Sequence, residues 1–161
     1  RKNMKSITQI ISFAALCGLL ISCNKDERQA KNSIEGMWEV TAITTTKGQI
    51  NNAFFVETST ETETGQLGTF DFLDETVNCN FTRIDTTYNG SSIWFLKSEK
   101  INAGFTRVNQ HTLTLTDNFI FDVTFEDDTK NAEKNAKKMT LTKNPIPNNS
   151  ILIMISLEKI E

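Results

Sequence analysis

The sequence predicts an all-β protein, an antiparallel up-and-down barrel of about eight strands, and three observations support this fold class. Apolar and polar residues alternate through most of residues 34–159, which is the pattern of strands with one buried and one exposed face. Turn-forming residues separate these runs at short intervals. The last run, residues 151–157, is apolar on both faces, as expected of a strand that pairs with the first strand and closes the barrel.

The individual strands are identified by this alternation, and a chain rich in Thr, Ile and Phe has the composition of strands. The apolar sets that alternate with polar neighbours are Trp38, Val40 and Ala42; Phe70 and Phe72; Val77, Cys79 and Phe81; Leu113 and Leu115; Phe119, Phe121, Val123 and Phe125; and Met139 and Leu141.

Breaks between strands are predicted from turn chemistry. Tight turns are expected at Lys47-Gly48 and Asn89-Gly90, because Asn and Gly tolerate the positive φ of such turns. The Thr-Glu repeat at residues 58–64 is interpreted as an exposed, mobile hairpin tip, and the polar stretch 127–138 as an exposed loop or a single helical turn. Further breaks are expected at residues 74–75, 102–104, 117–118 and 144–149.

The N-terminal segment has the layout of a secretory signal, with basic residues at Arg1, Lys2 and Lys5 before an apolar run over residues 7–21. The run is too short and too often interrupted to span a bilayer, which takes about 20 apolar residues. The sequence Leu20-Ile21-Ser22-Cys23 resembles the lipobox of bacterial lipoproteins. That resemblance implies that residues 1–22 are a signal peptide and that Cys23 is acylated and holds the chain on a membrane. The alternative is a plain signal peptide that ends beside a Cys by coincidence.

The residues after Cys23 are relevant to the cellular location of the protein. Residues 23–33 are interpreted as the lipidated Cys and a polar tether, followed by a barrel domain over residues 34–161. Asn24-Lys25-Asp26-Glu27 is similar to the export signal of lipoproteins from Bacteroidota-type bacteria, which implies a place in the outer membrane with display on the cell surface. The alternative is a solvated tether, which is what charged runs usually are.

Length and charge limit the classes of function. Loss of 22 of the 161 residues would leave 139, enough for one domain, and we expect a monomer. The leader holds three of the 17 basic residues and none of the 20 acidic ones, so the mature chain has a net charge of about −6. An acidic chain argues against nucleic-acid binding. Cys79 would be the one remaining thiol, so the core must be held by packing without a disulfide.

The run Ile34-Glu35-Gly36-Met37-Trp38-Glu39-Val40 resembles the Gly-x-Trp signature that opens the first strand of lipocalins and calycins. More closely, the chain resembles lipocalin-like domain lipoproteins of Bacteroidota-type bacteria, in which a lipobox and a short tether precede this strand. Gly36 and Trp38 are then structural signature residues. Later motifs in the same order are Gly68 to Phe72, Ile93-Trp94-Phe95, Leu113 to Asp117 and Met139 to Thr142.

Two features depart from lipocalins proper. In that family the indole of the signature Trp packs against a basic side chain, usually Arg, near the last strand, and the C-terminal strand here offers Lys159. The sequence also shows no lipocalin helix between the last strands. The resemblance therefore favours a small lipocalin-like barrel.

No catalytic, cofactor or metal site is predicted. His111 is the single histidine and is expected in a surface turn, so a His-based triad or a multi-His metal site lacks its members. Cys79 lies on the predicted core face and is interpreted as a small buried hydrophobe rather than a nucleophile. The acidic groups at residues 71–75 and 126–128 lack the spacing of a calcium loop and are interpreted as solvated strand ends. The chain is therefore not expected to be an enzyme.

The distribution of Phe residues is the one positive indication of a ligand. An eight-stranded barrel is just wide enough to be filled by side chains or to hold one small molecule. A small hydrophobic ligand would be lined by Phe70, Phe72, Phe119 and Phe121. The alternative is a filled barrel that binds a protein or glycan partner through the loops at residues 58–66 and 127–138. A dry interior with an exposed aromatic patch would favour the second function.

Overall fold

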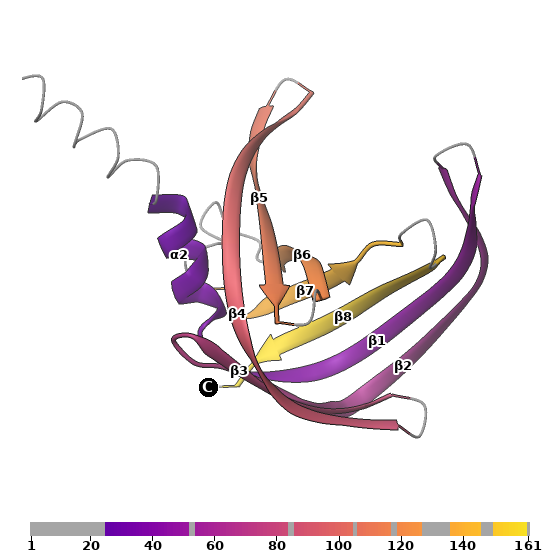
Figure 1. Cartoon of the computed structure of the whole chain (residues 1–161), viewed down its shortest axis with the longest axis horizontal. Helices are drawn as coiled ribbons and strands as arrows, with labels where there is room; N and C mark the ends of the chain where they lie inside the picture. The colour runs from indigo at the N-terminus through magenta and orange to yellow at the C-terminus, as the bar shows by residue number, and fades with distance from the viewer. Residues whose placement is uncertain are drawn as a thin grey trace, which may run out of the picture.

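The fold is a closed barrel of antiparallel strands, as the sequence predicts (Figure 1). The computed structural model describes residues 25–51, 54–83, 86–104, 106–116, 119–126, 136–145 and 150–160. Each strand in this part of the chain pairs with the next in sequence, and the last pairs with the first. Helix α2 (Lys25–Ile34) precedes the strands β1 (Gly36–Asn51), β2 (Phe54–Phe72), β3 (Thr76–Arg83), β4 (Thr86–Ala103), β5 (Thr106–Leu115), β6 (Phe119–Glu126), β7 (Lys138–Lys143) and β8 (Ile151–Lys159).

The closure of the barrel was predicted from the last strand and is confirmed. β8 pairs with β7 on one side and with β1 on the other, where Trp38 faces Lys159 and Lys47 faces Ile151. A strand with partners on both sides has no free edge.

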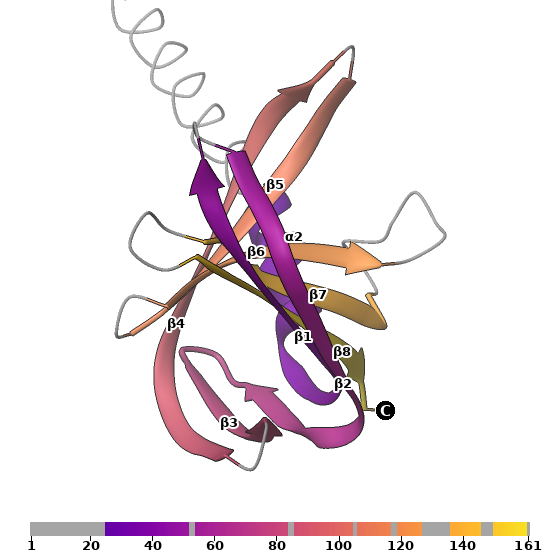
Figure 2. The same ribbon diagram turned by 90° about the vertical axis from the view of Figure 1, so that its right-hand side faces the viewer.

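The strands are strongly staggered, so two long hairpins project from the body of the barrel (Figures 1 and 2). β2 pairs with β1 along its length but with β3 only over Gly68 to Phe72. Most of β2 therefore has a neighbouring strand on one side only, among the residues that the structure describes. β4 uses Thr86 to Ile93 to pair with β3 and Trp94 to Ala103 to pair with β5, so the β4–β5 hairpin extends past the rest of the sheet.

The first strand departs from simple alternation at one place. Its register to both neighbours shifts between Val40 and Ala42, which marks a β-bulge at Thr41. A bulge adds one residue and exchanges the two faces of the strand beyond it. Ile43 therefore lies in the core and Ala42 is only half-buried, the reverse of the predicted alternation.

Three predicted turns and tips lie inside strands, so those predictions are wrong. Lys47-Gly48 is in β1, where a second register shift follows Lys47. The ring of Phe55 lies over Gly48 so closely that a Cβ there would be 2.5 Å from its Cζ, and close approach rather than a turn accounts for this glycine. Asn89-Gly90 is in β4, and the Thr-Glu repeat at residues 58–64 is in β2, where Thr60 and Thr62 share hydrogen bonds with Thr46 and Thr44.

The segment expected to be a polar tether is largely helical, and that prediction is also wrong. Asp26 and Glu27 in the first turn of α2 and Lys31 in its last turn suit the helix dipole. Ala30 and Ile34, one turn apart, are completely buried and supply the apolar face that the mean polarity of the segment concealed. Gly36, with a φ of 112°, then turns the chain into β1.

The core lies between α2 and the inner faces of all eight strands. Its buried members form one cluster: Ile34, Trp38, Val40, Ile43, Phe70, Phe72, Val77, Trp94, Leu113, Phe121, Val123, Ala136, Met139, Leu141, Ile155 and Leu157. Cys79 packs against this cluster as a half-buried, free thiol, in the position predicted for it. The predicted features at residues 1–24, 117–118, 127–135 and 146–149, Cys23 among them, lie outside the described residues.

If α2 is part of the folded unit, Ile34→Ala should destabilise the barrel by about 2–5 kcal/mol, because it leaves a cavity beside Trp38. Urea unfolding followed by Trp fluorescence measures the change. The matched control is Asn32→Ala on the exposed face of the same helix, which should change stability by less than about 0.5 kcal/mol. Equal, small effects of both substitutions would show that the helix does not contribute to the stability of the barrel.

Candidate functional site

The barrel interior is the first candidate site, since three of the four predicted ligand-lining Phe residues are buried there. Phe70, Phe72 and Phe121 are all buried in the core cluster. Phe70 stacks on Phe72 and on Phe81, with ring centroids 5.9 and 5.3 Å apart. Phe72 also meets Trp94 edge to face at 5.5 Å. These are the contact geometries of aromatic side chains that pack against one another.

Phe119, the fourth predicted lining residue, is not brought into this cluster. It is the first residue of β6, pairs with the last residue of β5 and is 46% exposed. Lys143 Nζ lies 4.2 Å from the centroid of its ring, as in a cation–π pair at the surface. Alternation predicts an inward position for both Phe119 and Phe121 and is correct for Phe121. Phe119 is the first residue of its strand, where it is not covered by the core. The predicted lining set is therefore wrong for Phe119.

Gly36 and Trp38 both lie beside Lys159, next to the C-terminal end of α2. Trp38 is completely buried, and its indole Nε1 donates a hydrogen bond of 2.6 Å to the carbonyl oxygen of Ile34, at the end of α2. The Gly36 backbone has a positive φ, and a Cβ there would lie 3.3 Å from Lys159 Cε. Both the conformation and the close approach of the lysine favour glycine at this position.

Lys159, near the C-terminal end of β8, lies over the indole of Trp38. Its Nζ lies 5.2 Å from the centroid of the Trp38 ring and donates a hydrogen bond of 2.9 Å to the carbonyl oxygen of Ser33. Burial lowers the pKa of Lys159, against a weaker opposing effect of Glu35. A lysine held in this way positions the last strand against the helix end, and its chemistry is structural.

A second lysine–tryptophan pair joins α2 to β4 and to the connection between β2 and β3. Lys31 forms an ion pair of 2.9 Å with Asp74 in the connection between β2 and β3, and its Nζ lies 5.6 Å from the centroid of the Trp94 ring. The hydrogen bond to Asp74 raises the pKa of Lys31. Trp94 Nε1 donates a hydrogen bond of 2.7 Å to the carbonyl oxygen of Leu73 in that connection.

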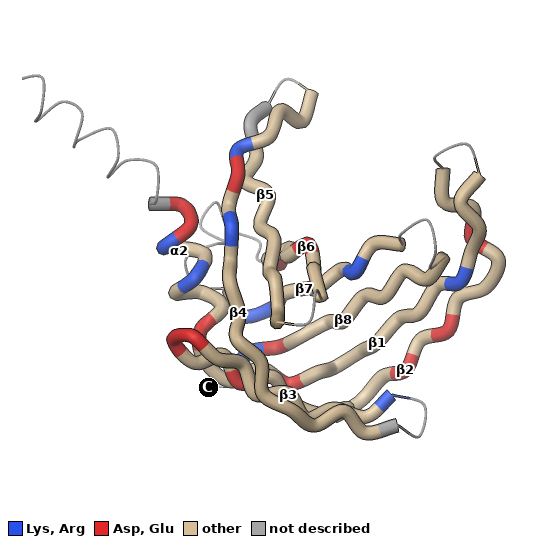
Figure 3. The backbone as a smooth tube through the Cα atoms, in the orientation of Figure 1, with Lys and Arg blue, Asp and Glu red and all other residues tan. Residues whose placement is uncertain are grey.

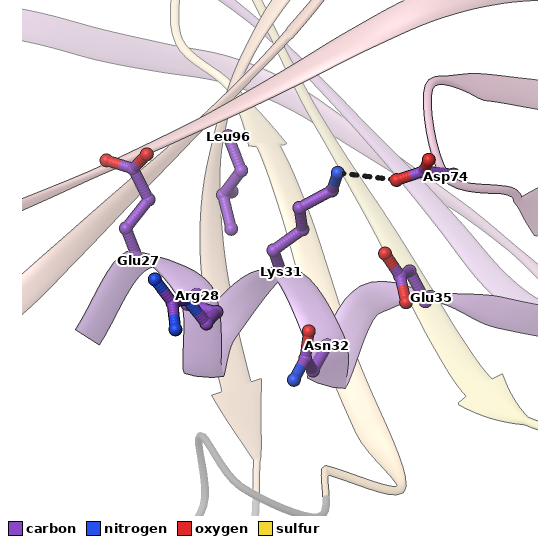
Figure 4. Close-up of a pocket in the computed structure, with 7 residues that line it drawn as sticks. All are labelled: Glu27, Arg28, Lys31, Asn32, Glu35, Asp74 and Leu96. Atoms are coloured by element: carbon purple, nitrogen blue, oxygen red, sulfur yellow. Dashed lines mark hydrogen bonds and ion pairs between the residues drawn. The ribbon is translucent and has the colours of Figure 1, made fainter. Parts of the chain in front are cut away.

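The Lys31–Asp74 pair also crosses a groove beside α2 (Figure 4). The groove has a volume of about 380 Å³ and is lined by Glu27, Arg28, Lys31, Asn32, Glu35, Asp74 and Leu96. Five of these seven side chains are charged, with both signs present, and Leu96 is the only apolar one. Such a lining suits water and ions better than a hydrophobic molecule, so the groove does not replace the predicted apolar pocket.

His111 lies in the middle of β5 and is buried, so its predicted position in a surface turn is wrong. Its Nδ1 shares a hydrogen bond of 2.7 Å with the Ser98 hydroxyl, and its ring meets Phe125 edge to face at 5.3 Å. Its contacts are those of a hydrogen-bonded core histidine. Sequence reasoning missed it because the strand was expected to begin after His111, whereas β5 begins at Thr106 and His111 continues the inward alternation of Leu113 and Leu115.

Cys79 and the acidic residues were the other side chains considered for a catalytic or metal-binding role. Cys79 Sγ donates a long hydrogen bond of 3.5 Å to the Gly90 carbonyl oxygen, and burial raises the pKa of this thiol, which disfavours the reactive thiolate. Within the described ranges, no three His, Cys, Asp or Glu residues are placed so that they could hold a metal ion. No described helix has the length and apolar character needed to cross a membrane.

An exposed apolar patch on the outer face of the barrel was not predicted. Phe95 on β4 is 64% exposed, and Thr114 on β5 pairs with both Phe95 and Ile120 of β6. Ile93, two residues before Phe95 on the same face, is also exposed. We call Ile93, Phe95 and Ile120 the outer patch. The sequence did contain a signal for this patch, because the four residues from Ile93 to Leu96 are all apolar. In a strand with one face exposed to solvent, every second residue of such a run must be exposed.

Substitutions on β6 can distinguish a barrel interior that is filled by side chains from one that contains an open pocket. Phe121→Ala should cost about 3–5 kcal/mol of unfolding free energy if the ring is packed on all sides. Phe119→Ala, on the same strand, should cost no more than about 1 kcal/mol, the value of an exposed cation–π contact. Urea unfolding of both variants checks this, and a small effect at Phe121 would indicate a ring that lines an open space.

Comparison of the chain with protein-family models, with curated proteins and with solved structures finds no match.

Proposed function

We propose that the chain is a lipid-anchored protein of the bacterial outer membrane, held by acyl chains on Cys23. Its filled lipocalin-like barrel is a rigid scaffold that binds a protein or glycan partner at the cell surface. The observation that carries the choice of a partner over a small ligand is the packing of Phe70, Phe72 and Phe121 within the core cluster.

The anchor is supported by the arrangement of the N-terminal residues. A basic start, an apolar run and the Leu20 to Cys23 motif come in the order that lipoprotein processing needs. Helix α2 and every strand that the structure describes follow Cys23 in the chain, so cleavage before Cys23 would remove none of them. Two or three acyl chains on one Cys give stable binding, which a single chain does not.

Binding of a partner is supported by the outer patch. Large apolar side chains that lie together on the surface of a small protein mark sites of interaction more often than chance exposure does. The outer patch has a ring and two aliphatic side chains on β4 and β6, and Thr114 of β5 lies between Phe95 and Ile120 in the sheet. This combination of apolar and hydroxyl groups suits a protein surface or the face of a sugar ring. The two loops first expected to bind a partner are less suitable, since residues 58–66 are in β2 and residues 127–135 lie outside the described residues.

A small hydrophobic ligand is the second candidate function. It is favoured by a set of apolar side chains that pack against the core yet are only partly buried: Leu67, Phe81, Leu115, Phe125 and Ile153. A ligand on these residues would lie above the packed aromatic rings rather than among them. Native mass spectrometry of the acylated protein after exposure to a lipid extract separates the two functions, since only this one predicts a bound species.

Cys23→Ser should abolish acylation and release the protein from membranes. The measurement is the intact mass of protein purified from a Gram-negative host, together with its partition between the detergent and aqueous phases. Ser22→Ala, which retains a small residue before the Cys, is the control and should be acylated normally. Membrane retention of the serine variant without added lipid mass would contradict the proposed anchor.

A photo-crosslinking amino acid at Phe95 should capture a partner of defined mass on living cells of the source organism. Phe95 is the most exposed member of the outer patch. The control position is Thr124, which is exposed on β6 on the same outer face as Ile120 but further along the strand. Adducts at Phe95 that are absent at Thr124 and are lost in the Ile120→Ser background would support the patch as the binding surface. Equal adducts at both positions would contradict it.

A further inference from the structure

We propose that the side of β2 that faces away from β1 along residues 54–67, which we call the free edge, is a docking surface for another protein. It binds an extended, basic peptide segment as an added β-strand. The segment that fits has Lys or Arg at every second position. This inference goes beyond the proposed function, since it involves neither Cys23 nor the outer patch.

The free edge is long for a strand without a second neighbour. Of the 19 residues of β2, only the five from Gly68 to Phe72 pair with β3. The remaining 14 have β1 as their one partner among the strands that the structure describes, and β1 separates them from β8 (Figure 1). At about 3.3 Å per residue, this edge extends over roughly 40 Å, more than a strand of ordinary length needs for pairing.

The free edge is held in its extended form by contacts with β1. On the outer face of the β1–β2 hairpin, the hydroxyls of Thr60 and Thr62 share hydrogen bonds of 2.9 and 3.0 Å with those of Thr46 and Thr44. Residues 54–67 contain no proline, which would remove a backbone donor from the edge. Because the edge is already ordered, adding a strand costs conformational entropy mainly in the incoming segment.

The charge of the free edge indicates the chemistry of the segment that fits it. Residues 54–67 hold three acidic residues, Glu57, Glu61 and Glu63, and no basic one. Figure 3 shows acidic positions along this part of β2. Lys47 is the only basic residue in the part of β1 that pairs with them. Among the described residues, neither Glu57 nor Glu61 forms an ion pair, so their charges are not neutralised within the chain.

The register places two of these charges on one face of the sheet. Glu61 pairs with Thr45, which is buried on the inner face. Glu63 pairs with the core residue Ile43, so both carboxylates belong to the inner face. Glu57 lies beyond the register shift, on the outer face. A strand with basic residues at alternate positions would place two of them beside Glu61 and Glu63. Backbone hydrogen bonds then supply affinity, and the opposite charges select a basic segment.

The test measures binding of a fluorescent peptide of about ten residues in which Thr and Lys alternate and both ends are blocked. The full chain is produced in a Gram-negative host and purified in detergent, and binding is followed by fluorescence anisotropy. Glu61→Gln should weaken binding about two- to five-fold, the value of one pair of opposite charges across strands. The matched control is Glu75→Gln, which removes an exposed charge from the β2–β3 connection and should leave the affinity unchanged. A peptide with Glu in place of Lys should not bind.

Methylation of the peptide backbone tests for an added strand directly. Successive residues of a strand direct their N–H groups to opposite sides, so an added strand pairs through one alternating set of amides. One peptide is methylated on the lysine amides and a second on the threonine amides. Binding should be abolished in one of them and retained in the other. Amide hydrogen exchange should show added protection within residues 54–67 when the unmethylated peptide is bound.

Four outcomes would overturn the inference. Binding of both methylated peptides would show an electrostatic contact without strand pairing. Equal loss of affinity in Glu61→Gln and Glu75→Gln would show that net charge alone attracts the peptide. Added protection confined to another segment would place the peptide elsewhere. Absence of binding at about 1 mM peptide would show that the free edge does not accept this class of segment. None of these results depends on the anchor at Cys23, which is tested separately.

Discussion

The closed end of the barrel depends on how the C-terminal end of α2 is capped. A helix leaves its last carbonyl groups without intrahelical donors. Here Trp38 and Lys159, from the first and last strands, donate to the carbonyl oxygens of Ile34 and Ser33. The same lysine lies over the same indole, so one contact joins the helix to the two strands that close the barrel. The remainder of the core packs on this junction, since Ile34 and Trp38 are both completely buried within it.

The strands and the closure of the barrel could be predicted from the sequence, because successive side chains of a strand point to opposite faces and apolar and polar residues therefore alternate. The errors arose where tertiary contacts change the local pattern. The bulge at Thr41 is fixed by pairing with two neighbours, and Gly48 is placed by the ring of Phe55 rather than by a turn. The helix was missed because only Ala30 and Ile34 of its ten residues are apolar, which is too few for a clear hydrophobic period in a polar segment.

The candidate site was harder to predict than the fold. Alternation predicts which face of a strand a residue occupies, but not how far the residue lies from the end of the barrel. Phe121 and Phe119 are on the same face, and only Phe121 is far enough from the strand end to be buried. It also cannot show whether inward rings pack together or leave a space between them. The pairing of Lys159 with Trp38 could be anticipated only through the family resemblance, because the two residues are 121 positions apart in the chain and meet through β-sheet register.

The long unpaired side of β2 has a consequence for the behaviour of the protein at high concentration. An exposed strand edge can accept a strand from another molecule, and such pairing can start aggregation. The Thr-Glu repeat lies along this part of β2, with Glu57 and Glu61 both exposed. A second copy that added its own β2 edge to edge would bring like charges together, while the hydroxyls of Thr60 and Thr62 are already engaged with β1. The repeat that was expected to be a hairpin tip thus disfavours self-association through this edge of the sheet.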